Sequence, residues 1–401
     1  MKKIAIIGAG ILGISTGIEL LKSGKNLHIT VFEKERRVSS HASGRNSGVI
    51  HAGFYYSPES LKAKFCRTGN QELRQLCKDN QIPILETGKV VVARNEKELV
   101  ELERLFDRGI KNGVELELLE EGLLPAFEPL ARTYRKFLWS PTTAVSSPNL
   151  ISKVLIDEFL KLGGKLVLGE TVELEKINTK VYIKGDRVHY AYIINCAGTY
   201  SNRLAQQVGL ANDYLVVPFL GSYLGIGQAS LPLRTLIYPV PHPVNPFLGT
   251  HFTITAEGIV KIGPSAIPTL GRENYKLLRG IKFGELPEIS KGFLAILKGD
   301  KNDLTAIFRQ EIPKLNKNYL LRSALQLLSP DIKVEESSWK RKPPGIRAQL
   351  VAKSNGQLVQ DFMVESLYNS THVLNLVSPG WTCAIPFARW LSKEKIIPNL
   401  E

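Results

Sequence analysis

The segment Ile4-Ala5-Ile6-Ile7-Gly8-Ala9-Gly10-Ile11-Leu12-Gly13 decides the fold. Its short apolar run, Ile4–Ile7, is typical of a parallel strand that is buried on both faces. The glycine pattern opens a helix that continues to about Lys22, and the apolar run Leu27–Phe32 follows as a second strand. This strand–helix–strand order predicts an α/β, Rossmann-like, doubly wound domain that binds a dinucleotide.

The glycines have separate roles in such a turn. Gly8 permits the tight turn, Gly10 lets the backbone approach a pyrophosphate, and Gly13 lets the helix pack closely on the sheet. The first turn of the helix offers N–H groups and a partial positive charge to the phosphates. Glu33 ends the second strand, about twenty residues after Gly13. Its carboxylate can accept both ribose hydroxyls and disfavours the 2′-phosphate of NADP, but the motif serves FAD and NAD alike.

The loop after Glu33 favours FAD over NAD. It runs His41-Ala42-Ser43-Gly44-Arg45-Asn46-Ser47-Gly48-Val49-Ile50-His51-Ala52-Gly53, where an NAD enzyme would usually continue with regular βαβ units. A loop this rich in glycine and hydrogen-bonding side chains can pass over a bulky ring system and a pyrophosphate. We therefore predict FAD, held non-covalently. Covalent attachment through His41 is the less favoured alternative to a polar contact.

Length and composition are those of a two-domain globular protein. The chain has 401 residues, of which 43% are hydrophobic and 22% charged. These values exclude long disorder, a collagen-like repeat and a coiled coil. The net charge of +14 favours an anionic partner, which could be a small acid, a nucleotide, an anionic membrane or a nucleic acid. The basic residues are scattered apart from short runs such as Lys340-Arg341-Lys342, and no nucleic-acid module signature occurs, so we predict no nucleic-acid partner.

The cysteines and the uncharged stretches indicate the cellular location of the protein. Cys66, Cys77, Cys196 and Cys383 form no C-x-x-C pair, so we predict no metal site, no disulfide framework and a reducing compartment. Three uncharged stretches, Tyr214–Leu233, Thr235–Ala256 and Ser366–Ala388, are broken by proline and glycine and are predicted as buried strands and loops. The chain begins directly on the first strand, with no transit peptide. We expect a bacterial cytoplasmic location, with peripheral contact at the inner membrane left open.

Signals of the nucleotide domain recur along the chain. A helix at Pro148–Leu162 and a strand at Tyr192–Asn195 are followed much later by a strand at Val373–Val377 and a helix from about Trp381. We predict a discontinuous FAD-binding domain over 1–88, 145–212 and 340–401. The segments 89–144 and 213–339, all-β at first and then helical and charged, are predicted to form an α+β substrate domain with a mixed sheet.

Several segments carry a family likeness. They are Ile6-Ile7-Gly8-Ala9-Gly10 with Glu33, Ser43–Gly53 with Tyr55-Tyr56, Ser60-Leu61-Lys62-Ala63, Pro246-Phe247-Leu248-Gly249-Thr250-His251-Phe252-Thr253 and Gly345-Ile346-Arg347-Ala348-Gln349. Over nearly its whole length the chain resembles the glycine/D-amino-acid oxidase superfamily of FAD-dependent enzymes, and within it the L-2-hydroxyglutarate dehydrogenases and oxidases. Ser378-Pro379 keeps the family pattern, and the residues after it depart from it.

The resemblance implies where the cofactor lies. A mixed sheet of the substrate domain lies over the flavin ring, the backbone at Thr171-Val172 borders the adenine, and Ala197-Gly198 pass close to the dinucleotide. Together with the motif and the loop, it predicts these cofactor-binding residues: Gly8, Gly10, Ile11, Leu12, Gly13, Glu33, Lys34, Ser43, Gly44, Arg45, Asn46, Ser47, Gly48, Val49, Val172, Ala197, Gly198, Pro379, Gly380, Trp381 and Thr382.

The implied reaction oxidises the C2 hydroxyl of a small anionic 2-hydroxy acid, L-2-hydroxyglutarate, to give 2-oxoglutarate. It needs a hydride acceptor, a base and cations for the carboxylates. His251 and His51 are the candidate base and hydrogen-bond donor, with His251 preferred as the base. Arg347 matches the position that holds the substrate carboxylate in related oxidases, and Tyr56 and Tyr223 are candidates for lining the pocket. The cation for the second carboxylate is unassigned, and O2 and a membrane quinone both remain open as electron acceptor.

Two alternatives stand beside this reading. The first keeps the fold and makes the protein an amine or amino-acid oxidase of the glycine- or sarcosine-oxidase kind. The second is a basic nucleic-acid- or membrane-binding protein whose nucleotide fold is vestigial.

Overall fold

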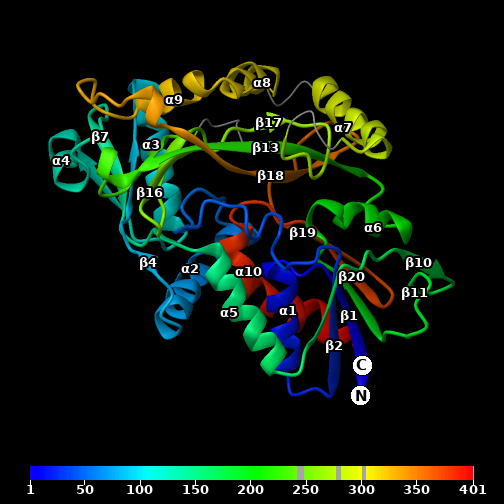
Figure 1. Cartoon of the computed structure of the whole chain (residues 1–401). Helices are drawn as coiled ribbons and strands as arrows, with labels where there is room; N and C mark the ends of the chain where they lie inside the picture. The colour runs from blue at the N-terminus through cyan, green and yellow to red at the C-terminus, as the bar shows by residue number, and fades with distance from the viewer. Residues whose placement is uncertain (242–247, 277–280, 300–303, 401) are drawn as a thin grey trace.

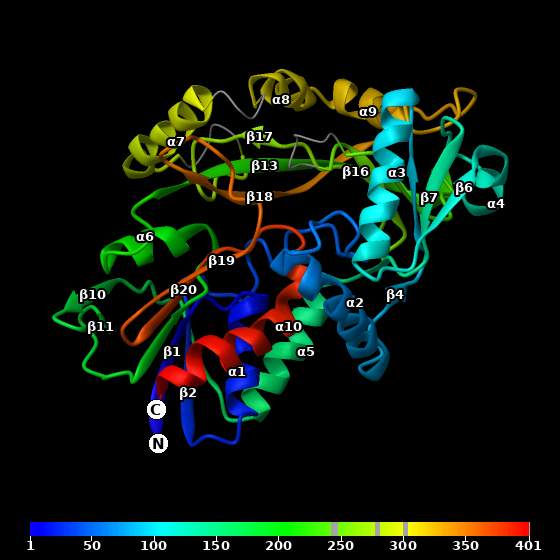
Figure 2. The same ribbon diagram turned by 180° about the vertical axis from the view of Figure 1, so that it is seen from behind.

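The computed structural model describes residues 1–241, 248–276, 281–299 and 304–400, without the side chains of 304–307. Two sheets form its two halves (Figure 1, Figure 2): a six-stranded sheet with helices on both sides, and a nine-stranded sheet covered by helices on its outer side. Pro246 and Phe247, in a segment that carries the family likeness, lie outside the described residues.

The six-stranded sheet is parallel except at one edge. Its order is β19-β20-β12-β1-β2-β9, and β19 runs antiparallel to β20. The strands are β1 (Lys2–Ile7), β2 (Leu27–Glu33), β9 (Lys165–Leu168), β12 (Tyr192–Asn195), β19 (Met363–Leu367) and β20 (Ser370–Asn375). The central position of β1 explains its apolar run, because both faces of such a strand are covered.

The two faces of β1 pack into different cores. Ile4 and Ile6 point toward α1 (Ile11–Leu21), α5 (Pro148–Lys161) and α10 (Gly380–Leu391), which pack together on one face. Ala5 and Ile7 point the other way, into the core under the hairpin of β10 (Leu174–Ile177) and β11 (Lys180–Ile183). The short helix α6 (Ser201–Gln207) also lies on that side (Figure 2).

The nine-stranded sheet is mixed and carries the largest core. Its order is β17-β13-β16-β15-β14-β5-β7-β6, with β18 paired to β13. The strands are β5 (Lys89–Val92), β6 (Glu117–Glu120), β7 (Lys136–Ser140), β13 (Tyr214–Gly227), β14 (Leu236–Pro239), β15 (His251–Ile254), β16 (Ile259–Gly263), β17 (Ile267–Pro268) and β18 (Lys340–Ala352). The helices α7 (Leu286–Lys298), α8 (Leu304–Glu311) and α9 (Lys317–Leu325) lie across its outer side, and α3 (Glu96–Lys111) covers the β5–β7 end (Figure 1).

Smaller elements complete the fold. The strands β3 (Val49–Ile50), β8 (Ala144–Ser146) and β4 (Ile84–Leu85) form a three-stranded sheet, and α2 (Leu61–Asp79) packs against α10. The one-turn helix α4 (Leu124–Phe127) lies beyond α3 (Figure 1). Within the described ranges, no helix combines the length and the apolar character needed to cross a bilayer.

Strand pairing bears on the proposed division into domains. β18 pairs with β13 from Tyr214 to Gly225, so residues 340–352 belong to the nine-stranded sheet. The predicted start of the last FAD-binding segment at residue 340 is therefore too early, and pairing favours a boundary after Ala352. The domain ranges otherwise remain a prediction. The strand was missed because its first residues, Lys340-Arg341-Lys342-Pro343-Pro344, show no apolar alternation.

Candidate active site

A cavity of about 660 Å³ lies where the two sheets meet. Its wall comes from the turn after β1, the end of β2, the loop 39–51, the segment after β12 and the N-terminus of α10 on one side. β13, β14, β15 and β18 supply the other side. The carboxyl ends of parallel strands are the usual ligand site of an open α/β sheet.

The glycine turn is shaped by close backbone contacts. Gly8 has a φ of +105°, and a Cβ there would lie 2.5 Å from the carbonyl oxygen of Cys196. A Cβ on Gly13 would lie 2.0 Å from the carbonyl oxygen of Gly8, so only glycine lets α1 pack this closely on β1. A Cβ on Gly10 would lie 2.9 Å from Ser43 Oγ, inside the cavity that a dinucleotide would occupy.

Glu33 and Ser43 organise this turn. The Glu33 carboxylate accepts the N–H of Ala9 at 2.9 Å and that of Glu35 at 3.0 Å, and Ser43 Oγ accepts the N–H of Ile11 at 2.9 Å. A carboxylate offers about four acceptor directions. Glu33 can therefore hold the turn and also accept ribose hydroxyls.

The loop between β2 and β3 is tied to the opposite side of the cavity. His41 Nδ1 lies 2.7 Å from the Tyr275 hydroxyl, and the Arg45 guanidinium lies 4.2 Å from the centre of the Tyr275 ring. Arg45 also donates from Nε to the carbonyl oxygen of Ser40 at 2.8 Å. A Cβ on Gly345 of β18 would lie 2.4 Å from the Arg45 carbonyl oxygen. The loop is therefore a packed layer between the sheets rather than a free surface loop.

His51 is buried at the end of this loop. The backbone N–H of His51 donates to Thr382 Oγ1 of α10 at 3.2 Å, and its backbone carbonyl oxygen accepts from Asn70 Nδ2 of α2 at 3.2 Å. Burial, followed by the charge of Lys89, holds the pKa of His51 well below its usual value. Its Nδ1 is buried without a hydrogen-bond partner among the described residues. The imidazole is therefore neutral at neutral pH.

His251 is neutral and has a defined tautomer. Burial lowers its pKa to about 3, and its ring stacks on Tyr238 with 3.7 Å between centroids. Its Nδ1 lies 2.9 Å from the carbonyl oxygen of Gly249. Because a carbonyl only accepts, Nδ1 carries the proton and Nε2 is the acceptor.

Arg347 brings a half-buried cation into the cavity wall. It lies on β18 opposite Phe219 of β13. Its charge is among those that lower the pKa values of His51 and His251, so the three side chains lie near one another. Burial lowers the pKa of Arg347 itself, but a guanidinium stays charged throughout the ordinary pH range.

Most predicted site residues line this one cavity. They are Gly8, Gly10, Ile11, Leu12, Glu33, Lys34, Ser43, Arg45, Asn46, Ser47, Val49, His51, Val172, Ala197, Gly198, Tyr223, His251, Arg347, Pro379, Gly380, Trp381 and Thr382. Their roles stay predictions, but the structure brings them together.

Four predicted residues do not line the cavity. Gly13, Gly44 and Gly48 act as spacers, since Cβ atoms on Gly44 and Gly48 would lie 2.3 Å from Ser39 O and 2.4 Å from Ser146 O. Tyr56 does not line the cavity directly, but its hydroxyl lies near enough to Arg347 for that charge to offset part of the rise in its pKa that burial causes. Its carbonyl oxygen accepts from Asn112, just after α3, at 2.9 Å, and its expected role in the pocket stays a prediction.

Sequence reasoning missed Lys89, Tyr238 and Glu311. Tyr238 stacks on His251, and Glu311 lines the cavity while its carboxylate accepts the N–H of Ala266 at 2.6 Å and pairs with Lys314. Lys89 is fully buried beside Tyr238. A signal for it was available in the sequence, because Lys89 directly precedes the apolar run Val90-Val91-Val92.

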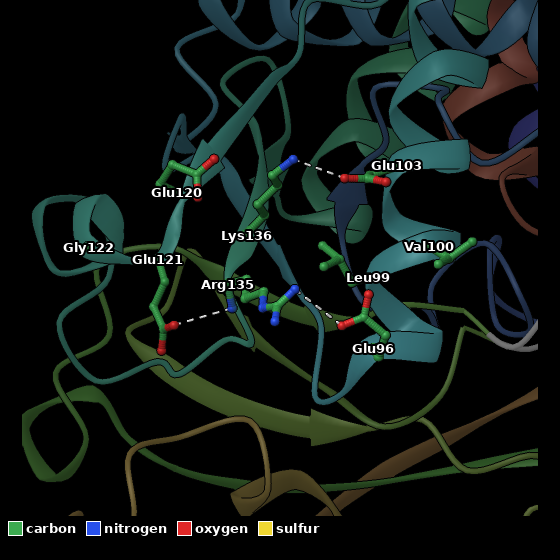
Figure 3. A pocket seen from close by; sticks show the side chains of 9 residues that line it. All are labelled: Glu96, Leu99, Val100, Glu103, Glu120, Glu121, Gly122, Arg135 and Lys136. Atoms are coloured by element: carbon green, nitrogen blue, oxygen red, sulfur yellow. Dashed lines mark hydrogen bonds and ion pairs between the residues drawn. The ribbon is translucent and has the colours of Figure 1, made fainter.

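A second pocket, of about 510 Å³, lies between α3, β6 and the turn Glu121–Leu123 (Figure 3). Its charged side chains are paired with one another: Lys136 with Glu103 at 3.0 Å and Arg135 with Glu96 at 3.5 Å. The backbone N–H of Arg135 also donates to Glu121 at 3.2 Å. These groups satisfy each other and offer no cofactor cradle.

A dinucleotide cradle that opens onto buried neutral histidines and a half-buried arginine is the arrangement of a nucleotide-dependent oxidoreductase. The sequence pattern of the DAO family, described as FAD dependent oxidoreductase, matches residues 3–394. The chain belongs to this family, which confirms the predicted fold class and the prediction of FAD over NAD.

Similar proteins span nearly the whole chain. One from Indibacter alkaliphilus, named L-2-hydroxyglutarate dehydrogenase, is 36% identical over 392 residues, 96% of each chain. The protein of that name from Escherichia coli K12 is 33% identical, covering 96% of this chain and 91% of that one. The mitochondrial L-2-hydroxyglutarate dehydrogenase of Mus musculus is 31% identical, and the match covers 97% of this chain and 87% of that one. The resemblance predicted from short motifs is confirmed at full length.

Solved structures share the fold. The FAD-bound L-α-glycerophosphate oxidase of Mycoplasma pneumoniae superposes with a TM-score of 0.70 at 22% identity, covering 97% of this chain and 94% of that one. Glycine oxidase of Bacillus cereus superposes with a TM-score of 0.68 at 15% identity, covering 98% and 94%. At these identities the likeness concerns the fold alone.

The cavity fits FAD on its own geometry. Gly10 leaves the cavity wall without a side chain where the pyrophosphate would lie, and Glu33 lies at the end of β2 within reach of a ribose. The turn at Gly10–Leu12 would hold the phosphates, and Thr171, Val172 and Ala197 would border the adenosine half.

Glu33→Gln should weaken FAD binding about tenfold, because the amide removes the charge and one of the acceptor oxygens. A fluorescence titration of apoprotein with FAD measures this dissociation constant. Glu19→Gln is the matched control, since Glu19 pairs with Arg389 on the surface of the helical layer. Equal affinity in the Glu33→Gln variant and the wild type would remove Glu33 from the ribose site.

Proposed function

We propose that this FAD-dependent oxidoreductase oxidises the C2 hydroxyl of L-2-hydroxyglutarate and releases 2-oxoglutarate. The observation that carries the proposal is the neutral His251, with Nε2 as acceptor, in the same cavity wall as Arg347. The names of relatives at 31–36% identity support the choice of acid.

Arg347, His251 and His51 have different roles in the proposed reaction. Arg347 grips the carboxylate next to the hydroxyl, which orients C2 toward the cofactor. His251 Nε2 accepts the hydroxyl proton, and His51 donates a hydrogen bond to the substrate. When bound, FAD supplies the acceptor for the C2 hydride.

FAD is proposed to be held without a covalent bond. Both ring nitrogens of His41 have polar contacts in the structure: Nδ1 with Tyr275 at 2.7 Å and Nε2 with Glu35 at 3.0 Å. A polar role for His41 accounts for these contacts. Denaturation in acid should release the flavin into the supernatant.

Anaerobic mixing tests the reaction itself. We expect L-2-hydroxyglutarate to bleach the flavin absorbance, and D-2-hydroxyglutarate, glycine, sarcosine and proline to leave it unchanged. Bleaching by one of the amines alone would favour the amine oxidase alternative. Colourless protein that cannot be reconstituted with FAD would exclude both.

Arg347→Met should raise KM for L-2-hydroxyglutarate by about a hundredfold, because a charge-assisted pair with the carboxylate is lost. Flavin content should stay at the wild-type level. Arg341→Met, on the same strand but exposed and bonded only to the Leu315 carbonyl oxygen among the described residues, is the control. Steady-state kinetics measure both, and wild-type KM in the Arg347→Met variant would contradict the assignment.

His251→Asn should slow flavin reduction by roughly 10²–10⁴-fold while substrate still binds, because the base is lost. Stopped-flow absorbance under anaerobic conditions gives this rate. The exposed His189→Asn serves as control. If His51→Asn slowed flavin reduction more than His251→Asn, His51 would be the base and His251 the hydrogen-bond donor.

The electron acceptor is proposed to be O2 or a membrane quinone, and one surface favours contact with an anionic bilayer. Phe283, Leu294 and Leu297 are 84%, 54% and 56% exposed on α7 and the turn before it. Lys282, Lys291 and Lys298 are exposed around them. Apolar side chains among lysines suit an interface between lipid tails and anionic headgroups.

Vesicles of anionic lipid should therefore sediment the protein at low salt, and 0.5 M salt should weaken the binding. The triple variant Phe283→Ser, Leu294→Ser, Leu297→Ser should remain in the supernatant with its flavin bound. Val100→Ser, Ile110→Ser and Ile177→Ser change other exposed apolar residues and are the control. Failure of the wild type to bind at any salt would exclude this contact.

A further inference from the structure

Lys89 is a buried cation that the reaction described above does not use. It is the first residue of β5 and is 0% exposed. Its Nζ lies 4.4 Å from the centre of the Phe54 ring and 4.6 Å from those of Tyr55 and Tyr238. In the part of the chain that the structure describes, this Nζ makes no hydrogen bond. A buried ammonium held by ring faces alone is unusual, because burying it without an acceptor is costly.

Strand register directs this side chain toward the site. Lys89 pairs with Leu236 of the parallel strand β14, so its side chain lies on the sheet face that also carries Tyr238, two residues further on. Ile237 pairs with Phe252, which places Tyr238 opposite His251, and their rings stack. Tyr238 and His251 line the cavity, and Lys89 lies directly behind them.

The neighbouring carboxylates are occupied elsewhere. Glu311 accepts the N–H of Ala266 and pairs with Lys314, and Asp361 accepts the N–H groups of Leu61 and Lys62. Arg347 is the cation already assigned to the carboxylate beside the hydroxyl. Glu311 lines the cavity and its charge acts on Arg347, but it is itself paired with Lys314, so Lys89 is a further positive charge near the histidines.

We propose that Lys89 determines specificity for dicarboxylates: its charge, held behind Tyr238 by three aromatic rings, favours dianionic over monoanionic acids in the cavity. The role rests on the proposed function and supplies the cation for the second carboxylate. Lys89 acts across the Tyr238 ring and does not line the cavity, so its effect is electrostatic rather than a direct contact.

The charge of Lys89 depends on pH. Burial lowers its pKa to about 7. The titratable and charged groups that face it are Tyr55, Tyr238, His51, His251 and Cys66. Burial keeps both tyrosines and both histidines neutral near pH 7. A dianion therefore binds best below the pKa of Lys89 and loses affinity as the pH rises through it.

Two unreactive acids of equal chain length test this in the holoenzyme. Glutarate is a dianion and pentanoate a monoanion at both pH 6.0 and pH 8.5, and their binding can be followed by the change in flavin absorbance. For the wild type we expect glutarate to bind about tenfold more weakly at pH 8.5 than at pH 6.0, and pentanoate to change less than twofold.

Substitutions separate charge from packing. Lys89→Met should lose about tenfold in glutarate affinity at pH 6.0, lose its pH dependence, and keep pentanoate affinity within twofold. Lys89→Arg, which stays charged, should bind glutarate at least fivefold more tightly than Lys89→Met, with no decrease at pH 8.5. Lys136→Met, on the adjacent strand β7 at the surface, is the matched control and should bind both acids like the wild type.

If Lys89→Met lost affinity equally for glutarate and pentanoate, the role of Lys89 would be structural and the proposal would be overturned. If that variant does not fold, the wild-type comparison decides, and equal pH dependence for the two acids overturns it. Glutarate discrimination without flavin bleaching by L-2-hydroxyglutarate would instead exclude the proposed reaction and leave Lys89 selecting another dicarboxylate.

Discussion

The close approach of Gly13 to the Gly8 carbonyl oxygen is the contact on which the site depends. It brings the first turn of α1 to the carboxyl end of β1. There Ser43, in the loop that follows β2, accepts the N–H of Ile11, and the loop packs against the helix. The same loop presents the Arg45 carbonyl oxygen to Gly345 of β18, at a distance that leaves no room for a side chain. The glycine turn therefore positions the loop, and the contact between Arg45 and Gly345 joins that loop to the nine-stranded sheet.

Burial, more than hydrogen bonding, sets the chemistry of this cavity. His51 and His251 are neutral chiefly because they are removed from water, and the same effect lowers the pKa of Lys89 to about 7. Aromatic rings replace water around these groups: Tyr238 lies against His251 on one side and Lys89 on the other. Such an arrangement weakens the fold locally, and an anionic ligand that neutralises it returns part of that cost.

The sequence predicted what local patterns encode. The first βαβ unit and α5 begin and end within a residue or two of expectation, because apolar runs and flanking glycine or proline mark them directly. The loop with Arg45 was found from its position after Glu33 and its composition, whereas the segment with His251 was found through its likeness to known enzymes. What was missed depends on pairing between distant segments. β18 belongs to the nine-stranded sheet because it pairs with β13, more than a hundred residues earlier, and Lys89 belongs to the site because β5 lies beside β14.

The hydrogen bond from the His51 backbone to Thr382 has a consequence for biosynthesis. Residue 51 leaves the ribosome early, whereas α10, which holds it and packs against α1 and α2, is translated more than three hundred residues later. Pro379, Gly380 and Trp381 of that same turn close the cavity wall. A nascent chain that has exposed only its glycine turn therefore lacks one side of the pocket. The pocket is complete only once residues 379–382 are in place, so full flavin binding is expected late in translation.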